Sequence, residues 1–323
     1  MALSDLAVYS EYAYLAMTET IAQQIELFNA ASGGTIVLVP AAHQGDFSDE
    51  AFFAKISGLV RRRNSYGTGA ISQKTLKHLV DTSVKVAAGT SEVRLDPGQF
   101  RWIQLNPEVA GAAMGQQLAG DLLADMLNTA IGCGVSALSQ TTEVVKDVTA
   151  ATAPADVPSF VNMAQAAGLF GDRQNAIRAW IMHSTPITGL FVNALTNAEK
   201  LFTYETVNVI RDPFGRLYVV TDSPSLQFTG SPGGFYSLGL TQGGLYVGQN
   251  NDFDAAETVA TGDENIKRTY QAEWSYNVGV QGYSWDKPNG GKSPTDAALF
   301  TASNWDKYST SHKDLAGVLL KSH

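Results

Sequence analysis

The chain has 323 residues, of which 44% are apolar and 16% are charged, and its formal net charge is −9. This length allows a substantial core in one elaborate domain or two, and the acidic balance argues against nucleic-acid binding by the whole surface. The only cysteine, Cys133, excludes an intramolecular disulfide and a multi-cysteine metal site. Neither a secretion signal nor a run of roughly 18 apolar residues is present, so we expect no membrane association.

The first predicted element is a helix over residues 4–31, which ends at a pair of glycines. Apolar and aromatic side chains cover much of its circumference, including Tyr9 and Tyr12. A helix that is apolar on several sides is expected to touch more than its own subunit. We therefore predict that these two tyrosines contact a neighbouring subunit. A short strand over Thr35–Val39 follows, ended by Pro40.

Residues 43–95 have a different pattern, in which strand-like pieces are separated by single glycines. This predicts an extended hairpin or arm with some helical content. The segment 61–101 holds eight basic and three acidic residues, whereas residues 1–60 hold one basic and seven acidic residues. A basic arm on an acidic body is suited to set the register between neighbouring subunits, although a solvated charged face is the alternative. Because a guanidinium pairs bidentately with a carboxylate, we expect Arg61, Arg62 and Arg63 to bind carboxylates of an adjacent subunit.

The most distinctive stretch is residues 106–138, which reads as one long helix after a turn at residues 96–98. Asn106 is a suitable N-cap and Pro107 fits the first helical position. Apolar residues recur at intervals of three and four along its whole length, which predicts a buried stripe. Glycines at 111, 115 and 120 each weaken a helix by about 1 kcal/mol relative to alanine, so we expect another backbone to lie close to them.

Beyond a small, proline-containing boundary at 149–158, helices and strands alternate. The patterns predict three short helices in the segments SFVNMAQAAGLFG, DRQNAIRAWIMHS and TPITGLFVNALTN, then a hairpin formed by TVNVIRD and RLYVVTD. They predict a second hairpin within FYSLGLTQGGLYVGQ, a long strand over 266–286, a short capped helix and a final strand. The expected fold class is α+β.

The sequence contains few signatures of catalysis. The five histidines are scattered, none has the i, i+4 spacing of a helical zinc site, and no G-x-S-x-G motif is present. His183 follows an apolar run and is expected to be a satisfied core or interface histidine. We therefore predict no catalytic residues, no cofactor and no metal site. An α/β enzyme would need a convergent acid/base or metal cluster that this inventory does not supply.

The order of these elements resembles the major capsid proteins of tailed bacteriophages with the Hong Kong 97-type fold. Four stretches carry the resemblance: LDPGQFRWIQLNPEVAGAAMGQQLAGDLLADMLNTAIG, RQNAIRAWIMHSTPITGLF, NVGVQGYSWD and SNWDKYSTSHKDLAGVLL. The resemblance covers nearly the whole chain. It implies an N-terminal arm, an extended loop, a peripheral domain with the long helix as its spine, and an axial domain. The implied ranges are 1–40 for the arm, 41–96 for the loop, 97–155 for the peripheral domain with a return strand at 265–290, 156–264 for the axial domain and 291–323 for a C-terminal segment.

The resemblance also implies a mechanical function. The subunit would form hexamers and pentamers of an icosahedral head shell that encloses double-stranded DNA without sequence-specific binding. Implied partners are a scaffolding protein, a portal protein and, as in some members of the family, a decoration protein. The resemblance implies assembly in the host cytoplasm and a final place in the virion. Because the sequence begins at Met1, no cleaved N-terminal segment is expected, and we expect no lysine crosslink in the loop. A bacterial nanocompartment shell, which encloses cargo protein, is the alternative with the same fold class.

Overall fold

The structure is a computed structural model that describes most of the chain. The described residues are 2–41, 43, 45–53, 60–71, 73–152, 155–190, 199–204, 207–211, 217–230, 232–250, 252–262 and 264–323.

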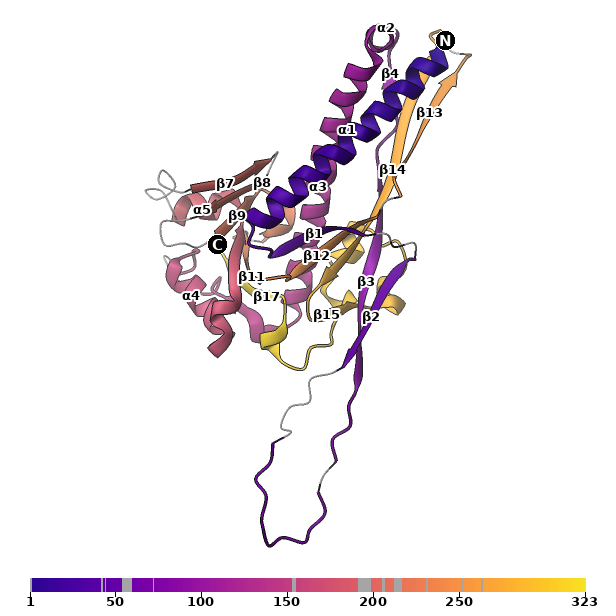
Figure 1. The fold of residues 1–323 in the computed structure, drawn as a ribbon. Helices are drawn as coiled ribbons and strands as arrows, with labels where there is room; N and C mark the ends of the chain where they lie inside the picture. Colours follow the sequence, from indigo (N-terminus) through magenta and orange to yellow (C-terminus); the bar gives the residue numbers. More distant parts are fainter. Residues whose placement is uncertain are drawn as a thin grey trace.

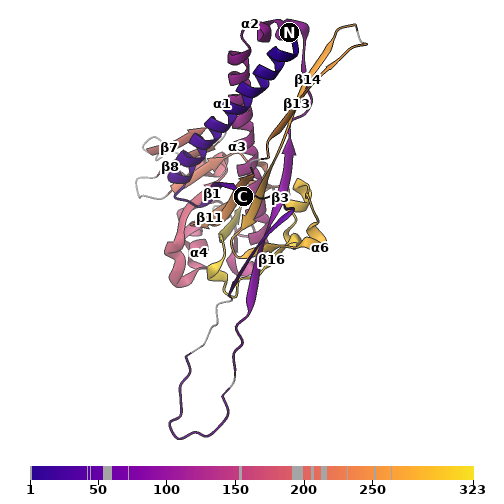
Figure 2. The same ribbon diagram turned by 45° about the vertical axis from the view of Figure 1, so that its right-hand side comes forward.

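The molecule has a central body from which segments project at opposite ends (Figure 1). Two long helices, α1 (Ala2–Ala31) and α3 (Pro107–Ser139), leave the body together toward one end, where the N-terminus lies. The strands β13 (Asp254–Ala260) and β14 (Lys267–Val280) project beside them (Figure 2), and β4 (Val93–Leu95) pairs with β14 near the same end. The loop between β2 and β3 extends from the opposite end. The predicted long helix and the predicted extended arm are thus both confirmed.

The two long helices touch backbone to backbone. A Cβ atom at Gly115 would overlap the carbonyl oxygen of Ala13, and one at Gly111 would overlap the carbonyl oxygen of Tyr9. Small residues allow this approach because they place no side chain between the two helices. Gly120 is buried as well. The prediction that another backbone approaches the helical glycines is confirmed at Gly111 and Gly115.

The start of α3 differs from the prediction. Residues 96–105 do not form a simple turn: a separate helix α2 (Pro97–Leu105) begins there, and the backbone N–H of Asp96 donates to Oε1 of Gln99 at 3.2 Å. Asn106 ends α2 and precedes α3, and its side chain makes no capping hydrogen bond. Asn106 N–H instead donates to carbonyl oxygens of α2, so the residue serves mainly as the C-cap of the preceding helix.

A nine-stranded sheet is built around β14, which pairs with β12, β13, β3, β4 and β15. Strand β1 continues through Pro40 rather than ending there, because it lies at the sheet edge, where a missing N–H breaks no ladder bond. Beyond β14 the predicted 266–286 strand is interrupted at Gly282, whose φ of 88° turns the chain into β15. The other strands of this sheet are β1 (Ile36–Ala41), β2 (Phe47–Phe53), β3 (His78–Gly89), β4 (Val93–Leu95), β12 (Leu245–Asn250), β15 (Tyr283–Trp285) and β16 (Trp305–Lys307).

The second sheet has eight strands, in the order β5-β17-β11-β6-β9-β8-β7 with β10 paired to β11. The predicted hairpin of β8 with β9 is confirmed by their antiparallel register, and its turn lies outside the described residues. The predicted second helix is wrong, because residues 177–182 form a central strand of this sheet. The strands are β5 (Val145–Asp147), β6 (Ile177–Met182), β7 (Glu199–Tyr204), β8 (Val207–Arg211), β9 (Leu217–Thr221), β10 (Gln227–Phe228), β11 (Gly234–Thr241) and β17 (Gly317–Ser322).

The predicted second hairpin is also wrong. Strands β11 and β12 belong to different sheets, and the chain crosses between them at Gly243 and Gly244. Gly243 has a φ of 69°, and its N–H donates to the carbonyl oxygen of Gly34 at 2.7 Å. A Cβ at Gly244 would lie 2.7 Å from the carbonyl oxygen of Ala316. The Gly244 N–H donates to the carbonyl oxygen of Thr241 at 3.2 Å, so the glycine pair lies in a tight turn that joins two sheets instead of two strands of one hairpin.

The remaining helices are short. The helix α4 (Phe160–Gly168) is confirmed, and Ser159 caps it, since the Asn162 N–H donates to Oγ of Ser159 at 3.1 Å. The helix α5 (Ser184–Leu190) is confirmed as far as Leu190, and residues 191–198 of that prediction lie outside the described residues. Near the C-terminus the predicted capped helix is α7 (Asp296–Leu299), preceded by α6 (Lys287–Gly290).

Two apolar clusters hold the molecule together. The main core surrounds most of α3 and joins both sheets, and the small core lies at the projecting end. By length and composition α3 could cross a membrane, but 78% of its most apolar window is buried inside the protein, as in the core helix of a soluble protein. The small core consists of Tyr9, Leu95, Phe100, Ile103, Ala110, Tyr270 and Ala272.

Candidate inter-subunit surfaces

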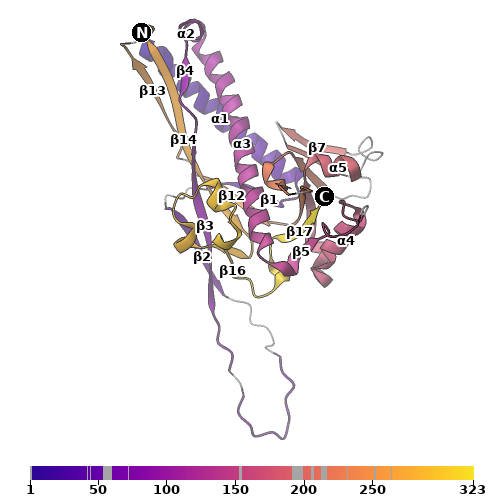
Figure 3. The same ribbon diagram turned by 180° about the vertical axis from the view of Figure 1, so that it is seen from behind.

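The extended loop leaves the body as the antiparallel pair β2–β3, in register from Phe47 opposite Val84 to Phe53 opposite His78. Beyond this pair the described residues 60–71 and 73–77 form neither helix nor strand and extend away from the body (Figure 3). Thus the part of the arm that the structure describes contains none of the predicted helical content. Apolar side chains stand unprotected on it: Val60 is 94% exposed and Tyr66 is 95% exposed. Large apolar side chains in such a position are typical of a surface that another molecule covers.

The arginine run lies on this loop. Arg61, Arg62 and Arg63 are all exposed, and none of them forms an ion pair within the described part of the chain. The sequence prediction that they bind carboxylates of an adjacent subunit stays a prediction.

The two tyrosines of α1 have different surroundings. The ring of Tyr9 is 5% exposed and packs edge to face on Tyr270, with 6.1 Å between ring centres. Burial, together with the nearby carboxylate of Glu257, raises the pKa of Tyr9. Tyr12 is 37% exposed, and on the same helix Leu15 is 54% exposed. Tyr9 therefore belongs to the small core of its own subunit, whereas Tyr12 remains accessible to a neighbour.

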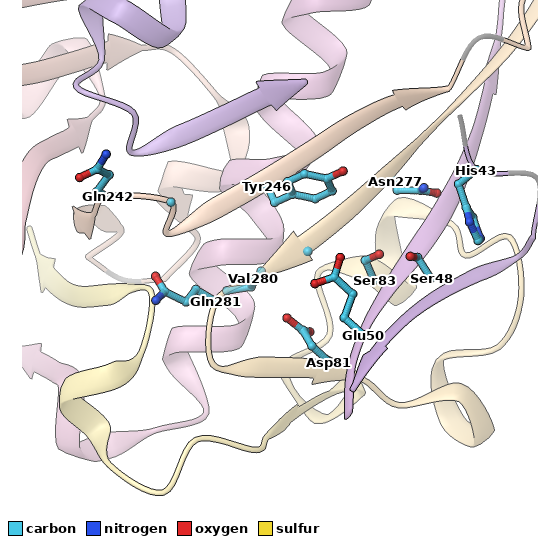
Figure 4. A pocket seen from close by; sticks show the side chains of 12 residues that line it. His43, Ser48, Glu50, Asp81, Ser83, Gln242, Tyr246, Asn277, Val280 and Gln281 are labelled. Atoms are coloured by element: carbon cyan, nitrogen blue, oxygen red, sulfur yellow. The ribbon is translucent and has the colours of Figure 1, made fainter. Parts of the chain in front are cut away.

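A polar cavity of about 520 Å³ opens where the loop joins the body. Its walls come from the β2–β3 hairpin, from β12 and β14, and from the crossing between the two sheets. Figure 4 shows Glu50 and Asp81 on the hairpin, with Tyr246 and Gln281 beyond them. The lining residues are His43, Ser48, Glu50, Asp81, Ser83, Gln242, Gly243, Tyr246, Asn277, Gly279, Val280 and Gln281.

The carboxylates of the hairpin are paired unequally. Asp46 and Asp49 face lysines on α6 and directly after it, with Nζ–O distances of 3.1 Å from Asp46 to Lys292 and 2.6 Å from Asp49 to Lys287. The hydrogen bond from Lys287 lowers the pKa of Asp49. Among the described residues no lysine or arginine lies within 4.0 Å of Glu50 or Asp81. The carboxylates that line the cavity are thus the two without a cationic partner.

The carboxyl group of Asp81 has a perturbed pKa. It lies directly opposite Glu50 in the β2–β3 register. Burial raises the pKa of Asp81 to about 6, the charge of Glu50 adds to this effect, and the hydrogen bond that Tyr308 Oη donates to Oδ2 at 3.1 Å opposes it. The other oxygen, Oδ1, is buried without a hydrogen-bond partner. The sequence did not reveal this site, because it depends on the pairing of two distant segments.

Among the described residues, no group of three histidine, cysteine or carboxylate side chains is arranged to hold a metal ion. His183 is 8% exposed, its Nδ1 accepts from the Thr185 N–H at 3.2 Å, and its Nε2 lies 2.6 Å from the Gln227 amide. It is therefore a satisfied core histidine, as predicted. Burial raises the pKa of the Cys133 thiol well above its usual range, so this cysteine is unreactive.

The sequence matches a family model described as Gp13-like, major capsid protein 13-like, over residues 5–319. The chain belongs to this family. This capsid protein is therefore a head-shell protein of tailed phages, and the predicted recognition and function are confirmed. The sequence has no significant match among curated proteins.

The fold of this capsid protein is similar to that of a solved phage capsid. The capsid of Ralstonia phage GP4 is similar with a TM-score of 0.50 and 10% identity, covering 90% of this chain and 87% of the other. A chain of Microbacterium phage Oxtober96 has a TM-score of 0.46 and 12% identity, covering 90% of both chains. The capsid of Myoviridae phage XM1 has a TM-score of 0.46 and 13% identity, also covering 90% of both. At 10% identity the Ralstonia phage GP4 capsid is similar in fold alone, and the predicted α+β fold of the Hong Kong 97 type is consistent with it.

Proposed function

We propose that this capsid protein builds an icosahedral head shell from hexamers and pentamers and that the shell encloses double-stranded DNA without sequence-specific contacts. The observation that carries this proposal is the open loop, where Val60 and Tyr66 are almost fully exposed. A subunit with such a loop is incomplete alone, and repeated subunits would cover one another's loops. In this proposal the protein has a structural role and needs no catalytic residue, cofactor or metal site.

The proposed partners are a scaffolding protein during assembly, a portal protein in the shell and an external decoration protein. Assembly would take place in the host cytoplasm, and the mature protein would reside in the virion. The net charge of −9 supports DNA enclosure without tight binding, because an acidic subunit does not attract the phosphate backbone over its whole surface.

We further propose the domain division implied by the resemblance: an arm at 1–40, a loop at 41–96, a peripheral domain at 97–155 with 265–290, an axial domain at 156–264 and a C-terminal segment at 291–323. The two sheets support a division of this kind. Since β12 and β13 pair with β14, we count these two strands with the peripheral part rather than with the axial part.

Expression with the scaffolding protein, followed by light scattering and electron microscopy, tests the assembly. Closed shells and rings are expected, and nuclease-protected DNA is expected in particles from infected cells. A monodisperse monomer under all conditions with the scaffold contradicts the proposal. Closed shells that hold cargo protein and no DNA would instead support a nanocompartment.

A further inference from the structure

The imidazole ring of His323 contacts two carbonyl groups at once. Its Nδ1 lies 2.9 Å from the carbonyl oxygen of Gly233, and its Nε2 lies 3.1 Å from the carbonyl oxygen of Thr149. A carbonyl oxygen can only accept a hydrogen bond, and a neutral imidazole carries a proton on just one of its two nitrogens. In the neutral ring the second nitrogen would turn its lone pair toward an oxygen. Both contacts are therefore hydrogen bonds only when the ring is the doubly protonated imidazolium.

The same reasoning gives a different protonation state for His183. Its Nδ1 accepts a hydrogen bond from the Thr185 N–H at 3.2 Å, so this nitrogen keeps its lone pair and the ring is neutral in this arrangement. His183 is also buried, whereas His323 is partly exposed and can exchange protons with solvent. Of these two histidines, only His323 is placed to hold an additional proton.

The two carbonyl groups belong to segments that are far apart in the sequence. Thr149 follows β5 in the proline-containing segment 149–158, and Gly233 lies directly before β11. Strand β17 lies between β5 and β11 in the second sheet, and His323 directly follows it. The backbone N–H of His323 also donates to the carbonyl oxygen of Asp156 at 2.9 Å. The ring thus joins the segments at the ends of three adjacent strands.

The other titratable groups on these segments belong to a different pH range. Carboxyl, ammonium and phenol groups ordinarily change charge outside the range of about pH 5 to 8, in which an imidazole does. Lys321 Nζ lies 3.4 Å from Oδ2 of Asp147, and Oδ1 of Asp147 accepts from the Thr149 N–H at 2.9 Å. The titratable side chains on the segments that meet at the ring are Lys146, Asp147, Asp156, Tyr236 and Lys321.

We propose that His323 forms a pH-dependent link in the second sheet. The doubly protonated ring binds the segment after β5 and the turn before β11 to the end of β17, and the neutral ring releases one of the two. The folded arrangement holds a proton that the free ring gives up as the pH rises, so the link is complete in acid and is lost toward alkaline pH. All of the groups belong to one subunit, so this inference goes beyond the proposed shell assembly and does not depend on it.

Hydrogen–deuterium exchange of the whole protein tests the link at about pH 5.5 and about pH 8. A local measurement is needed because Asp81 also titrates in this range and changes the stability of the whole subunit. Exchange is followed by mass spectrometry in peptides that cover 148–156 and 228–236, and it is expressed as protection factors, which remove the intrinsic pH dependence of amide exchange. Peptides from β6 serve as the reference for global changes. In the wild type, protection of at least one of the two segments is expected to fall about tenfold relative to β6 between the two pH values.

Two variants of His323 separate the proton from the contact. His323→Gln has one amide donor group at any pH, and His323→Lys keeps its charge over the whole range, so neither is expected to show the pH-dependent loss of protection. The matched control is His78→Gln, because His78 is an exposed histidine on β3, and this variant is expected to respond to pH as the wild type does.

Wild-type protection that stays constant relative to β6 overturns the inference, and this result needs no variant. A pH-dependent loss that persists in His323→Gln or His323→Lys also overturns it, because another group then carries the proton. Should both variants fail to fold, the wild-type comparison of the two segments with β6 decides. Failure of the wild-type protein to form shells with its scaffold concerns the proposed function alone.

Discussion

The carbonyl oxygen of Ala13 on α1 occupies the place where a side chain of residue 115 on α3 would begin. The two longest helices of the subunit are therefore held together by a contact between backbones, and Gly115 is required for it.

Replacing Gly115 by Leu is expected to destabilise the subunit. The substitution gains about 1 kcal/mol of helix propensity but overpacks the contact, at a typical cost of about 1–3 kcal/mol. A carbonyl oxygen cannot rotate away as a flexible side chain can, so the upper part of this range is expected. Thermal unfolding measures the effect, and shell yield should fall with it.

Gly168→Leu is the matched control, because Gly168 ends α4 and a Cβ there would meet nothing within 4 Å. Its melting temperature is expected to equal or slightly exceed that of the wild type. If Gly115→Leu has the same melting temperature as the control, α1 and α3 accommodate the larger side chain without loss of stability, and the prediction is wrong.

A second prediction concerns a hydrogen-bond network between α3 and β14. Tyr276 Oη donates to Oδ2 of Asp125 at 2.8 Å and lies 3.0 Å from Oγ1 of Thr129. Because Asp125 is itself exposed, water can replace the lost donor, and Tyr276→Phe is expected to cost about 0.5–1.5 kcal/mol in the free energy of unfolding. Denaturant unfolding measures it, with the almost fully exposed Tyr66→Phe as control. Equal stability of the two variants contradicts the prediction.

A third prediction follows from the opposite pKa changes on one hairpin. The pKa of Asp81 is raised to about 6, so the folded subunit binds a proton there that the unfolded chain has released. Its contribution to stability is fully present below the unfolded pKa, near 3.9, and is lost as the pH rises through about 6. Asp81→Asn should therefore remove a decline in subunit stability between about pH 4 and pH 6.

Asp49→Asn is expected to act in the other direction, because the Lys287 hydrogen bond lowers the pKa of Asp49. The stability that Asp49 contributes is present above its unfolded pKa and is lost as the pH falls through its lower folded value. Melting temperatures of the isolated subunit over pH 3–8 check both variants. If the melting temperatures of the wild type and Asp81→Asn change with pH in the same way, the raised pKa of Asp81 is contradicted.

The fourth prediction separates folding from assembly. Alanine at Arg61, Arg62 and Arg63 together should leave the free energy of subunit unfolding within about 0.5 kcal/mol of wild type, because all three side chains are exposed. Shell yield by electron microscopy should fall, since the loop loses the charges that it presents to a neighbour. Arg101→Ala, an exposed site on α2, is the control with normal yield. If the triple alanine variant gives a normal yield of shells, the arginine run is a solvated charged face and makes no contact that assembly needs.

The sequence predicts most accurately those helices and strands in which the buried side chains recur at one regular spacing along the chain. Helices α1 and α3 are long enough for the three- and four-residue spacing to be unambiguous. Residues 177–182 were wrongly predicted because a short apolar run can be a strand or a helix, and only its position inside the second sheet decides. The glycines 243 and 244 resemble a hairpin turn locally, but the sheets that they connect are set by distant pairings.

The candidate site was predicted only in part. The arginine run stands out in the sequence because its charges are adjacent. The cavity does not, since Glu50 and Asp81 become neighbours only through the β2–β3 register and Asn277 joins them from β14. Tyr9 was expected to contact a neighbouring subunit but lies in the small core of its own. The sequence of α1 is apolar on several sides and does not reveal which of these sides the subunit itself covers.

Strand β14 has a mechanical consequence. It passes without a break from Tyr270 in the small core to Tyr276 in the main core, and α1 and α3 connect the same two clusters. A strand is already near the full extension of its backbone, at about 3.3 Å per residue, so it has almost no slack. Load applied at the projecting end is therefore carried to the body by three continuous elements in parallel, and the two cores respond to it as one elastic unit.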